Sequence, residues 1–368
     1  MRRQHLLPQL CMILLSMILP SPFFRFKVST FQFNALRCMK AAYITQTGPP
    51  DVIVFGDLPN PKPGPSDCLV KVAAVDVNPI DIYIRAGLIP SQLNFPYILG
   101  RDLAGVVVEC GPQAKRFKPG TRVWASGQGV GQRQGTFAEY VAVDERWLHA
   151  TPDGVEDQDI VAMSLVGITA HIGLVARAQL KPGETLFVNG GSGGVGSAVI
   201  QMGKVLGARI IATAGSDQKA QDCRKLGAEL ALNYKTQDVD AAIRRFAPNG
   251  VNVWWETVRE PSFERTIPLL AMQGRMILMA GRDAKPAFPV GPFYTKDCSI
   301  LGFAMFNSGD ETQAAAARDI NHWMGEGKLK ARIDRIMPLS QAAEAHRLQE
   351  ESTIKKSGLL SGKIVLKI

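Results

Sequence analysis

A glycine-rich turn between two apolar segments constrains the fold of this chain more than any other feature of its sequence. Residues 190–196 contain five glycines in seven positions. The apolar run at residues 185–189 is typical of a short buried strand, and apolar residues recur at helical spacing from residue 197 to 206. Residues 209–213 indicate a second buried strand. The segment therefore predicts strand, turn, helix and strand in a parallel α/β unit.

Within this turn, three glycines match the pattern G-x-G-x-x-G, which is typical of dinucleotide binding. The first permits the tight turn, the second lets a pyrophosphate approach the backbone, and the third lets the helix pack against the strand. The start of the following helix adds unpaired N–H groups and the positive end of its dipole. We therefore expect a dinucleotide at the turn residues Gly191, Ser192, Gly193, Gly194, Val195 and Gly196.

The end of the second strand predicts which dinucleotide binds. A site for NAD places Asp or Glu there, where the carboxylate binds the ribose 2′-hydroxyl. This chain has small residues at that point, including Gly215, and Lys219 follows within reach of a 2′-phosphate. Asp217 argues for NAD but lies beyond the strand end, and Lys219 has a second interpretation as a solvated helix lysine. We predict NADP(H) in preference to NAD(H).

Two other motifs use the same glycines. A P-loop needs Lys after its last glycine, but Ser197 follows Gly196, so that motif is excluded. The nucleophile elbow G-x-S-x-G does match, with Ser192 at its centre, and needs an acid and then a histidine later in the chain. Four later residues are candidates for those partners: Asp283, Asp297, His322 and His346. A serine hydrolase that uses Ser192 therefore stays an alternative.

The formal net charge of +9 suggests a nucleic-acid partner until its location is considered. Residues 1–40 contain six Lys and Arg residues and no Asp or Glu, which leaves +3 for the rest of the chain. The part that is expected to fold is therefore close to neutral, and no basic stripe runs along it. We expect no nucleic-acid partner.

The first 38 residues differ in composition from the rest. Arg2 and Arg3 precede an apolar run at residues 11–19, which ends at Pro20 and is too short to span a bilayer. A basic start and a short apolar run resemble a signal peptide, but no A-x-A-like cleavage site follows. We favour two other interpretations, a natural start at Met39 or a leader that lies on a membrane surface. Both agree with a cytoplasmic protein without a stable membrane span.

The remaining chain is predicted to form a β-rich domain and an α/β domain. Residues 39–163 contain short strands between Gly/Pro breaks, with the strongest at 69–77 and 104–108. Residues 164–305 alternate strands and helices, which predicts a doubly wound parallel Rossmann sheet. Residues 306–368 are expected to return to the first domain.

The individual elements follow from the same periodicities. Expected strands after the turn unit lie at residues 230–233, 251–256, 274–280, 299–303 and 363–368. Expected helices lie at residues 156–178, 218–226, 239–246, 262–270, 313–324 and 341–350.

The cysteines and histidines give no metal-binding pattern. The six cysteines include no C-x-x-C pair, and the five histidines form no H-E-x-x-H. We expect no metal ion and no disulfide framework, which fits a reducing compartment. His171 is predicted to be a helix residue rather than a ligand.

Residues 77–87, which read VNPIDIYIRAG, are similar to the V-N-P-x-x-x-Y-I-R-x-G segment of quinone oxidoreductases of the zeta-crystallin type. That family is the zinc-free branch of the medium-chain dehydrogenase/reductase superfamily. The resemblance covers residues 39–368 in order, with further matching segments at 99–107, 135–140, 189–196, 233–235 and 362–366. It implies a Rossmann domain inserted in a GroES-like catalytic domain, and it implies a homodimer.

The resemblance also implies the chemistry. Zinc-dependent members of the superfamily carry Cys where Asn78 stands, His where Arg101 stands, and a four-cysteine lobe after the position of Val123; this chain has none of these. Without these ligands, the chain would hold no zinc ion to activate an alcohol as a Lewis acid. The expected reaction is hydride transfer from NADPH to a quinone, and the alternative is an NADPH-dependent enoyl or 2-alkenal reductase.

The family's site residues map onto matching positions. Asn78, Tyr83 and Thr169 would lie near the nicotinamide, and Tyr83 would orient the acceptor or relay a proton. Gly215, Lys219 and Tyr234 would surround the 2′-phosphate and adenosine. The nicotinamide side would be lined by Gly281, Arg282, Phe303, Ala304 and Met305, and Lys363 would close it from the C-terminal strand. Asn78 and Tyr83 are the catalytic candidates.

Two segments depart from the family pattern. Residues 256–259 read Glu-Thr-Val-Arg where the family often has Asp-Ser-Val-Gly, and the preceding Trp254 and Trp255 are expected in the core. Residues 127–135 are longer and more polar than a plain turn, and we hypothesise that they shape the rim of the substrate cleft. A binding or structural role is a further alternative, since relatives of zeta-crystallin serve in lenses and some bind RNA.

Overall fold

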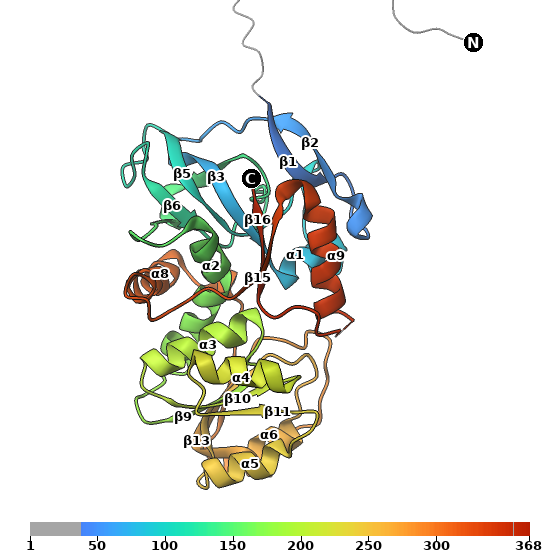
Figure 1. Cartoon of the computed structure of the whole chain (residues 1–368), viewed down its shortest axis with the longest axis vertical. Coiled ribbons are helices and arrows are strands. Elements are labelled where there is room, and N and C mark those ends of the chain that lie inside the picture. The colour runs from blue at the N-terminus through green and yellow to red at the C-terminus, as the bar shows by residue number, and fades with distance from the viewer. Residues whose placement is uncertain (1–37, 356) are drawn as a thin grey trace, which may run out of the picture. The chain divides into compact units, whose positions relative to one another are not determined.

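The computed structural model describes residues 38–355 and 357–368 (Figure 1). The predictions for the leader at residues 1–37 therefore lie outside the described part of the chain. Cys38 opens the first strand, and residues 38–368 form one unit that contains every element below.

The β-rich part of the chain forms two sheets, which we call the mixed-sheet lobe. A seven-stranded sheet has the order β15-β16-β3-β5-β6-β8 with β7 paired to β3, and a three-stranded sheet has the order β2-β1-β4. The C-terminal strand β16 lies between β15 and β3 and runs antiparallel to β3. The strands are β1 (Cys38–Ile44), β2 (Val54–Pro59), β3 (Asp67–Val77), β4 (Tyr97–Ile98), β5 (Leu103–Cys110), β6 (Arg122–Ala125), β7 (Tyr140–Asp144), β8 (Leu148–Ala150), β15 (Ile333–Pro338) and β16 (Lys363–Lys367).

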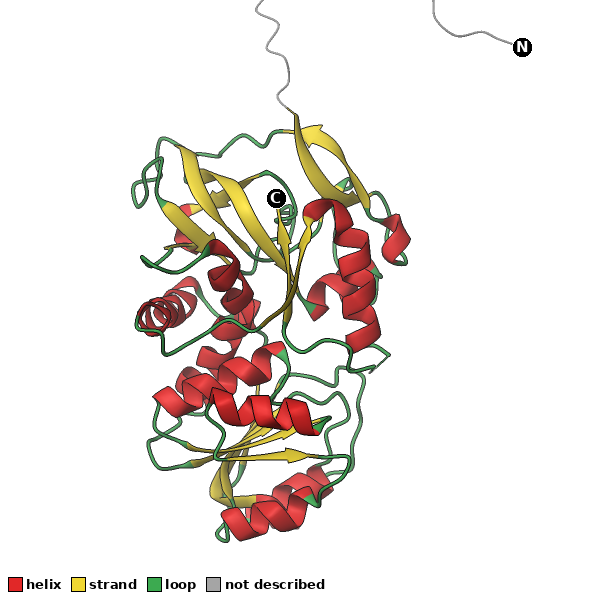
Figure 2. Ribbon diagram, in the orientation of Figure 1, coloured by secondary structure: helices red, strands yellow, loops and turns green. Residues whose placement is uncertain are grey.

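A six-stranded sheet, which we call the parallel-sheet lobe, has the order β11-β10-β9-β12-β13-β14, and its pairings are parallel. Figure 2 shows helices on both of its faces. In the labels of Figure 1, one side carries α3 (Gly194–Val205) and α4 (Asp217–Leu226), and the other carries α5 (Val239–Phe246) and α6 (Phe263–Leu269). The predicted doubly wound parallel sheet beside a β-rich domain is thus confirmed. Its strands are β9 (Thr185–Asn189), β10 (Arg209–Ala214), β11 (Leu230–Asn233), β12 (Val251–Glu256), β13 (Leu270–Leu278) and β14 (Ser299–Gly302).

Each helix that the sequence predicts is present, and the structure adds two short helices that were not predicted, α1 (Pro79–Arg85) and α7 (Val290–Tyr294). In α4, the Ser216 hydroxyl accepts a hydrogen bond from the Lys219 N–H, and Gly227 ends the helix with φ +125°. Strand β13 begins at Leu270, directly after the end of α6 at Leu269, rather than at residue 274 as predicted. The α-helices are α1 (Pro79–Arg85), α2 (Asp157–His171), α3 (Gly194–Val205), α4 (Asp217–Leu226), α5 (Val239–Phe246), α6 (Phe263–Leu269), α7 (Val290–Tyr294), α8 (Asp310–Gly325) and α9 (Ala342–Thr353).

Helix α2 joins the two lobes through a shared core. The sequence predicts one helix over residues 156–178, but the chain continues past α2 as a π-helix at Ile172–Arg177. A Cβ on Gly173 would lie 2.3 Å from the Trp255 ring, so glycine permits this close contact. One hydrophobic cluster contains α2 residues together with Trp124 of the mixed-sheet lobe and Leu186 of the parallel-sheet lobe.

The burial of these elements answers three predictions. Among the described residues, Asp157–Arg177 is the one helical stretch long and apolar enough to cross a membrane, but 78% of its apolar window is buried within the protein, as in a core helix. Trp254 and Trp255 are fully buried, which confirms their core placement. His171 is a helix residue as predicted, and its Nε2 lies 2.8 Å from Asp319 Oδ2 on α8.

Two histidines of the mixed-sheet lobe are held neutral by the core. Burial, and then the positive charge of Arg85, lower the pKa of His346 to about 3. Burial likewise lowers the pKa of His149 to about 4. The unfolded chain binds these protons near pH 6.5 and the native state does not, so the contribution of each histidine to stability is lost as pH falls below 6.5.

We predict that acidification from pH 7 to pH 5 lowers the free energy of unfolding of the wild-type protein by about 2 kcal/mol more than it lowers that of a His346→Leu variant. Urea denaturation at both pH values measures this difference, and the comparison cancels carboxylates that titrate in both proteins. His322→Leu is the control, since His322 is exposed on α8. Equal pH dependence in wild type and His346→Leu would contradict the prediction.

Candidate active site

The glycine turn between β9 and α3 is built by close backbone packing. Gly190 has φ +86°, and the Gly191 N–H donates to Thr213 O at 2.8 Å on the neighbouring strand β10. A Cβ on Gly196 would lie 2.2 Å from Gly190 O, whereas a Cβ on Gly193 would meet only that oxygen at 3.6 Å. The third glycine of the motif is therefore required for packing, and the second leaves open space at the start of α3.

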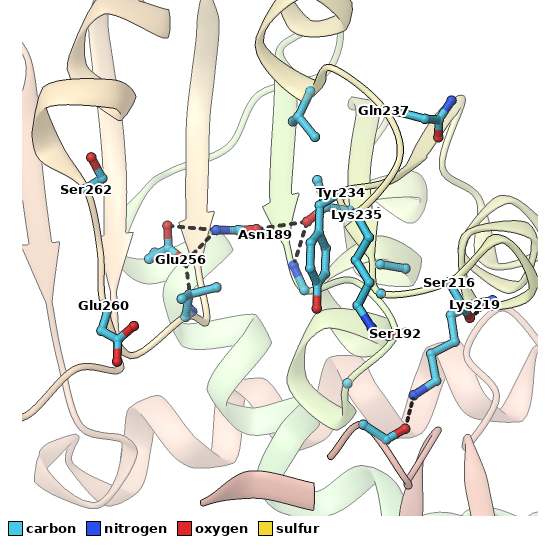
Figure 3. Close-up of a pocket in the computed structure, with 18 of the residues that line it drawn as sticks. Asn189, Ser192, Ser216, Lys219, Tyr234, Lys235, Gln237, Glu256, Glu260 and Ser262 are labelled. Carbon is cyan, nitrogen blue, oxygen red and sulfur yellow. Dashed lines mark hydrogen bonds between the residues drawn. The ribbon is translucent and has the colours of Figure 1, made fainter. Parts of the chain in front are cut away.

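A cavity of approximately 990 Å³ opens at the carboxyl ends of β9, β10, β11 and β12 (Figure 3). This edge is where ligands bind in open parallel sheets, and the volume suits a cofactor. A Cβ on Gly215 would lie 2.9 Å from the hydroxyl of Tyr234, so the two predicted residues are close neighbours. Of the predicted residues, the cavity brings together Ser192, Gly193, Gly215, Lys219 and Tyr234.

Lys219 lines this cavity but is not a freely solvated helix lysine. Its Nζ donates to Gly358 O at 2.6 Å and to Leu360 O at 2.9 Å, and Figure 3 shows the labelled Lys219 side chain at the cavity. Burial, and then the charge of Arg332, lower the pKa of Lys219. Asp217 accepts a hydrogen bond from Asn233 Nδ2 at 2.9 Å at the start of α4.

On the mixed-sheet lobe, Asn78 belongs to a buried polar cluster of five residues: Asp76, Asn78, Asp102, Ser126 and Lys363. Its Nδ2 donates to Asp102 Oδ2 at 2.8 Å and to Asp76 Oδ1 at 3.1 Å, and its Oδ1 accepts from Lys363 Nζ at 2.5 Å. Lys363 Nζ also lies 2.7 Å from Asp76 Oδ2, and Ser126 Oγ donates to Asp102 Oδ1 at 2.6 Å. Burial, and then the neighbouring Asp76, raise the pKa of Asp102 well above its usual range.

Arg101 occupies a second buried pair beside this cluster. Its Nε lies 3.7 Å from Asp81 Oδ1, and its guanidinium donates to Gln128 O at 2.6 Å. Burial raises the pKa of Asp81 to about 7, although the Arg101 charge opposes the shift. Asp81 also accepts from the Asn78 N–H at 2.8 Å, which forms a capping box at the start of α1. Residues 127–135 are thereby tied to the cluster through Gln128.

Lys363 links the cluster to the glycine turn. A Cβ on Gly194 would lie 3.2 Å from both Lys363 Cδ and Val166 of α2, so the lysine stem packs directly against the turn. Thr169 is buried on the same helix α2. Met305 is buried as well, and Ser126 Oγ approaches its sulfur at 3.9 Å. Of the predicted residues, Gly194 therefore contacts Lys363, and Met305 contacts Ser126 of the polar cluster.

The remaining predicted residues lie along the edge between the lobes. Tyr83 is half-buried on α1, and its hydroxyl accepts a hydrogen bond from Arg259 at 2.6 Å. Arg282 donates to Leu88 O, just beyond α1. Phe303 packs edge-on against Trp255 with ring centroids 6.5 Å apart, and Ala304 precedes a short 3₁₀ turn, Met305–Asn307. A Cβ on Gly281 would lie 2.5 Å from Arg259 O.

Sequence reasoning missed several of these residues. It noted Arg259 only as a departure from the family pattern, and a cation in place of a glycine was the signal that pointed to it. Asp76, Asp102 and Ser126 carry no local pattern, because β3, β5 and the end of β6 bring them together only in the folded sheet.

The structure does not assemble the partners of a serine nucleophile around Ser192. No histidine of the described residues lines the cavity to which Ser192 belongs. His346 is fully buried against Phe137, and His322 pairs with Glu326. Asp283 is exposed. Within residues 38–355 and 357–368, no group of three or more His, Cys, Asp or Glu side chains is arranged to hold a metal ion.

Comparison with known proteins places this geometry in a family. The Alcohol dehydrogenase GroES-like domain family matches residues 64–153, and the Zinc-binding dehydrogenase family matches residues 194–319. A human protein named quinone oxidoreductase is 30% identical over 332 residues, which cover 90% of this chain and 98% of that protein. The chain belongs to the zinc-free quinone oxidoreductases of the medium-chain dehydrogenase/reductase superfamily. As a member, it is an oxidoreductase.

Solved structures agree with this assignment. An NAD-dependent alcohol dehydrogenase is 30% identical, with a TM-score of 0.80 over 90% of this chain and 100% of that one. A mycobacterial protein solved in complex with NADPH is 26% identical, with a TM-score of 0.78 over 90% of this chain and 100% of that one. The two neighbours are named with different dinucleotides, so the fold alone does not decide between NAD and NADP.

We predict that Lys363→Met destabilises the protein by about 3–5 kcal/mol, because it leaves the buried carboxylate of Asp76 without its cation. Urea denaturation measures the loss. Adding Asp76→Asn to Lys363→Met should restore part of it, and Lys328→Met, at an exposed ion pair, should stay within about 0.5 kcal/mol of wild type. Full stability of Lys363→Met would show that the cluster does not need its lysine.

Proposed function

We propose that this oxidoreductase uses NADPH to reduce a quinone or a related electron-poor enone, without a metal ion. The observation that carries the proposal is the cavity at the glycine turn. Where β10 ends in this cavity, Gly215 and Ser216 replace the acid of an NAD site, and Lys219 stands three residues further on. The names of the human and mycobacterial relatives support the acceptor class and the cofactor.

When bound, NADPH supplies the hydride, and the protein supplies position and exclusion of water. The open space at Gly193 and the N–H groups at the start of α3 are suited to the pyrophosphate. Lys219 is suited to the 2′-phosphate, which would compete with the carbonyls of Gly358 and Leu360 for its ammonium. Gly215 and Tyr234 would border the adenosine.

At the acceptor end, Tyr83 is the proposed proton donor or orienting group, since it is half-buried on α1 and its hydroxyl contacts Arg259, whose neighbours Val258 and Glu260 line the cavity. The Asn78 amide nitrogen already donates to two carboxylates, so we propose that Asn78 positions Lys363 and α1 rather than moving a proton. Arg101 pairs with Asp81, and Asn78 accepts a hydrogen bond from Lys363. Neither an arginine nor an asparagine side chain is a usual ligand for zinc, which prefers Cys, His, Asp and Glu.

Titration of the protein with NADPH and with NADH, followed by fluorescence, is the primary test. We expect tighter binding of NADPH and oxidation of the bound NADPH on addition of a simple quinone. An enone in place of the quinone tests the alternative acceptor class. Binding of NADPH without oxidation by either acceptor would overturn the proposed reaction but keep the cofactor.

The two motif glycines give a sharper test of the cofactor site. We predict that Gly193→Ala folds normally but weakens NADPH binding by roughly tenfold or more, because its methyl group occupies the space for the pyrophosphate. Gly196→Ala should instead destabilise the fold by about 1–3 kcal/mol, since its Cβ meets Gly190 O. Unchanged NADPH affinity in Gly193→Ala would contradict the proposed position of the pyrophosphate.

The serine hydrolase alternative is separated by Ser192→Ala. An oxidoreductase has no need of that hydroxyl as a nucleophile, so we expect quinone-dependent oxidation of NADPH to persist in the variant. Esterase activity that depends on Ser192, in the absence of NADPH turnover, would favour the hydrolase.

A further inference from the structure

Arg259 crosses from one lobe to the other and ends on Tyr83. It lies just after β12 of the parallel-sheet lobe, whereas Tyr83 lies on α1 of the mixed-sheet lobe. The guanidinium donates to the Tyr83 hydroxyl oxygen at 2.6 Å. Its Cζ also lies 5.4 Å from the centroid of the Tyr83 ring. The two residues thus make a hydrogen bond and a cation–π contact at once.

The loop that carries Arg259 is fixed at several points. Glu256 Oε1 accepts from the Val258 N–H at 2.8 Å, and the Thr257 hydroxyl donates to Asn189 O beside the glycine turn. A Cβ on Gly281 would lie 2.5 Å from Arg259 O, so the glycine allows the two loops to pack together. Arg259 is therefore held in place by the same segment that borders the cofactor cavity.

This contact limits the direction in which the Tyr83 hydroxyl can donate its hydrogen. A tyrosine hydroxyl has one hydrogen to donate, and a guanidinium is only a donor. Because Arg259 donates to the Tyr83 oxygen, the phenolic hydrogen must point to another acceptor. The guanidinium charge also stabilises negative charge that develops on that oxygen when the proton leaves.

We propose that Arg259 is a positioning residue, which orients the Tyr83 hydroxyl toward the acceptor and stabilises the phenolate formed when that proton is transferred. The inference rests on the proposed function. In the step, hydride from NADPH reduces the acceptor, and the O–H bond of Tyr83 breaks as its proton passes to the acceptor oxygen. Water then returns a proton to the phenolate, so the acceptor gains one hydride and one proton overall.

A double-mutant cycle tests this assignment. We expect Arg259→Met to lower kcat by about ten- to a hundredfold in the Tyr83 background, with KM for NADPH nearly unchanged. In the Tyr83→Phe background, the same change should have little further effect, because the hydroxyl is gone. Phenylalanine keeps the ring and its cation–π contact, so a purely structural role of Arg259 would persist in that background.

Two further variants sharpen the cycle. Arg259→Lys keeps a cation near the phenol and should recover part of the lost turnover. Arg347→Met, which removes an exposed cation on α9, should leave turnover as in wild type. Fluorescence titration with NADPH provides a readout apart from activity, and Arg259→Met should bind the cofactor with wild-type affinity.

The outcomes separate the inference from the function on which it rests. If the wild-type protein oxidises NADPH with neither a quinone nor an enone, the proposed function itself is wrong. If the wild type is active and Arg259→Met lowers turnover equally with Tyr83 and with Tyr83→Phe, only the role assigned to Arg259 is overturned. Full activity of Tyr83→Phe would overturn the proton step, and the role of Arg259 with it.

Discussion

The ammonium of Lys363 is the interaction on which the arrangement of the site depends. It comes from the last strand of the chain, packs its stem against the glycine turn, and ends between Asn78 and Asp76. A buried charge of this kind is stable only with a charged partner and satisfied hydrogen bonds. Because the stem of this lysine packs against Gly194, the buried cluster of the mixed-sheet lobe also contacts the glycine turn of the parallel-sheet lobe.

Much of the fold could be predicted from the sequence, because it rests on local signals. The five glycines of residues 190–196, the apolar run of β9 and the capping signals of α4 each act within a few residues. The doubly wound sheet follows from the alternation of such units. Even the boundaries of α5 and β12 agree with the periodicity, since their ends carry clear turn residues.

The parts that could not be predicted depend on contacts between distant segments. Nothing near Asp76 or Asp102 indicates that they share Asn78, and nothing near residue 219 indicates that Lys219 reaches the carbonyls of residues 358 and 360. The close contact of Gly173, in the π-helix after α2, with the ring of Trp255 joins two segments that lie far apart in the chain. Arg259 was visible as an exception to a family pattern, but its contact with Tyr83 needed the fold.

The measurement that tests the central claim most directly is oxidation of NADPH carrying deuterium at the transferred position of its nicotinamide. An enone acceptor is best, because a transferred deuterium stays on carbon and is counted by mass spectrometry. The account predicts slower turnover than with unlabelled NADPH, and deuterium at the β-carbon of the product. Turnover without deuterium in the product would contradict direct hydride transfer from a cofactor held at the glycine turn.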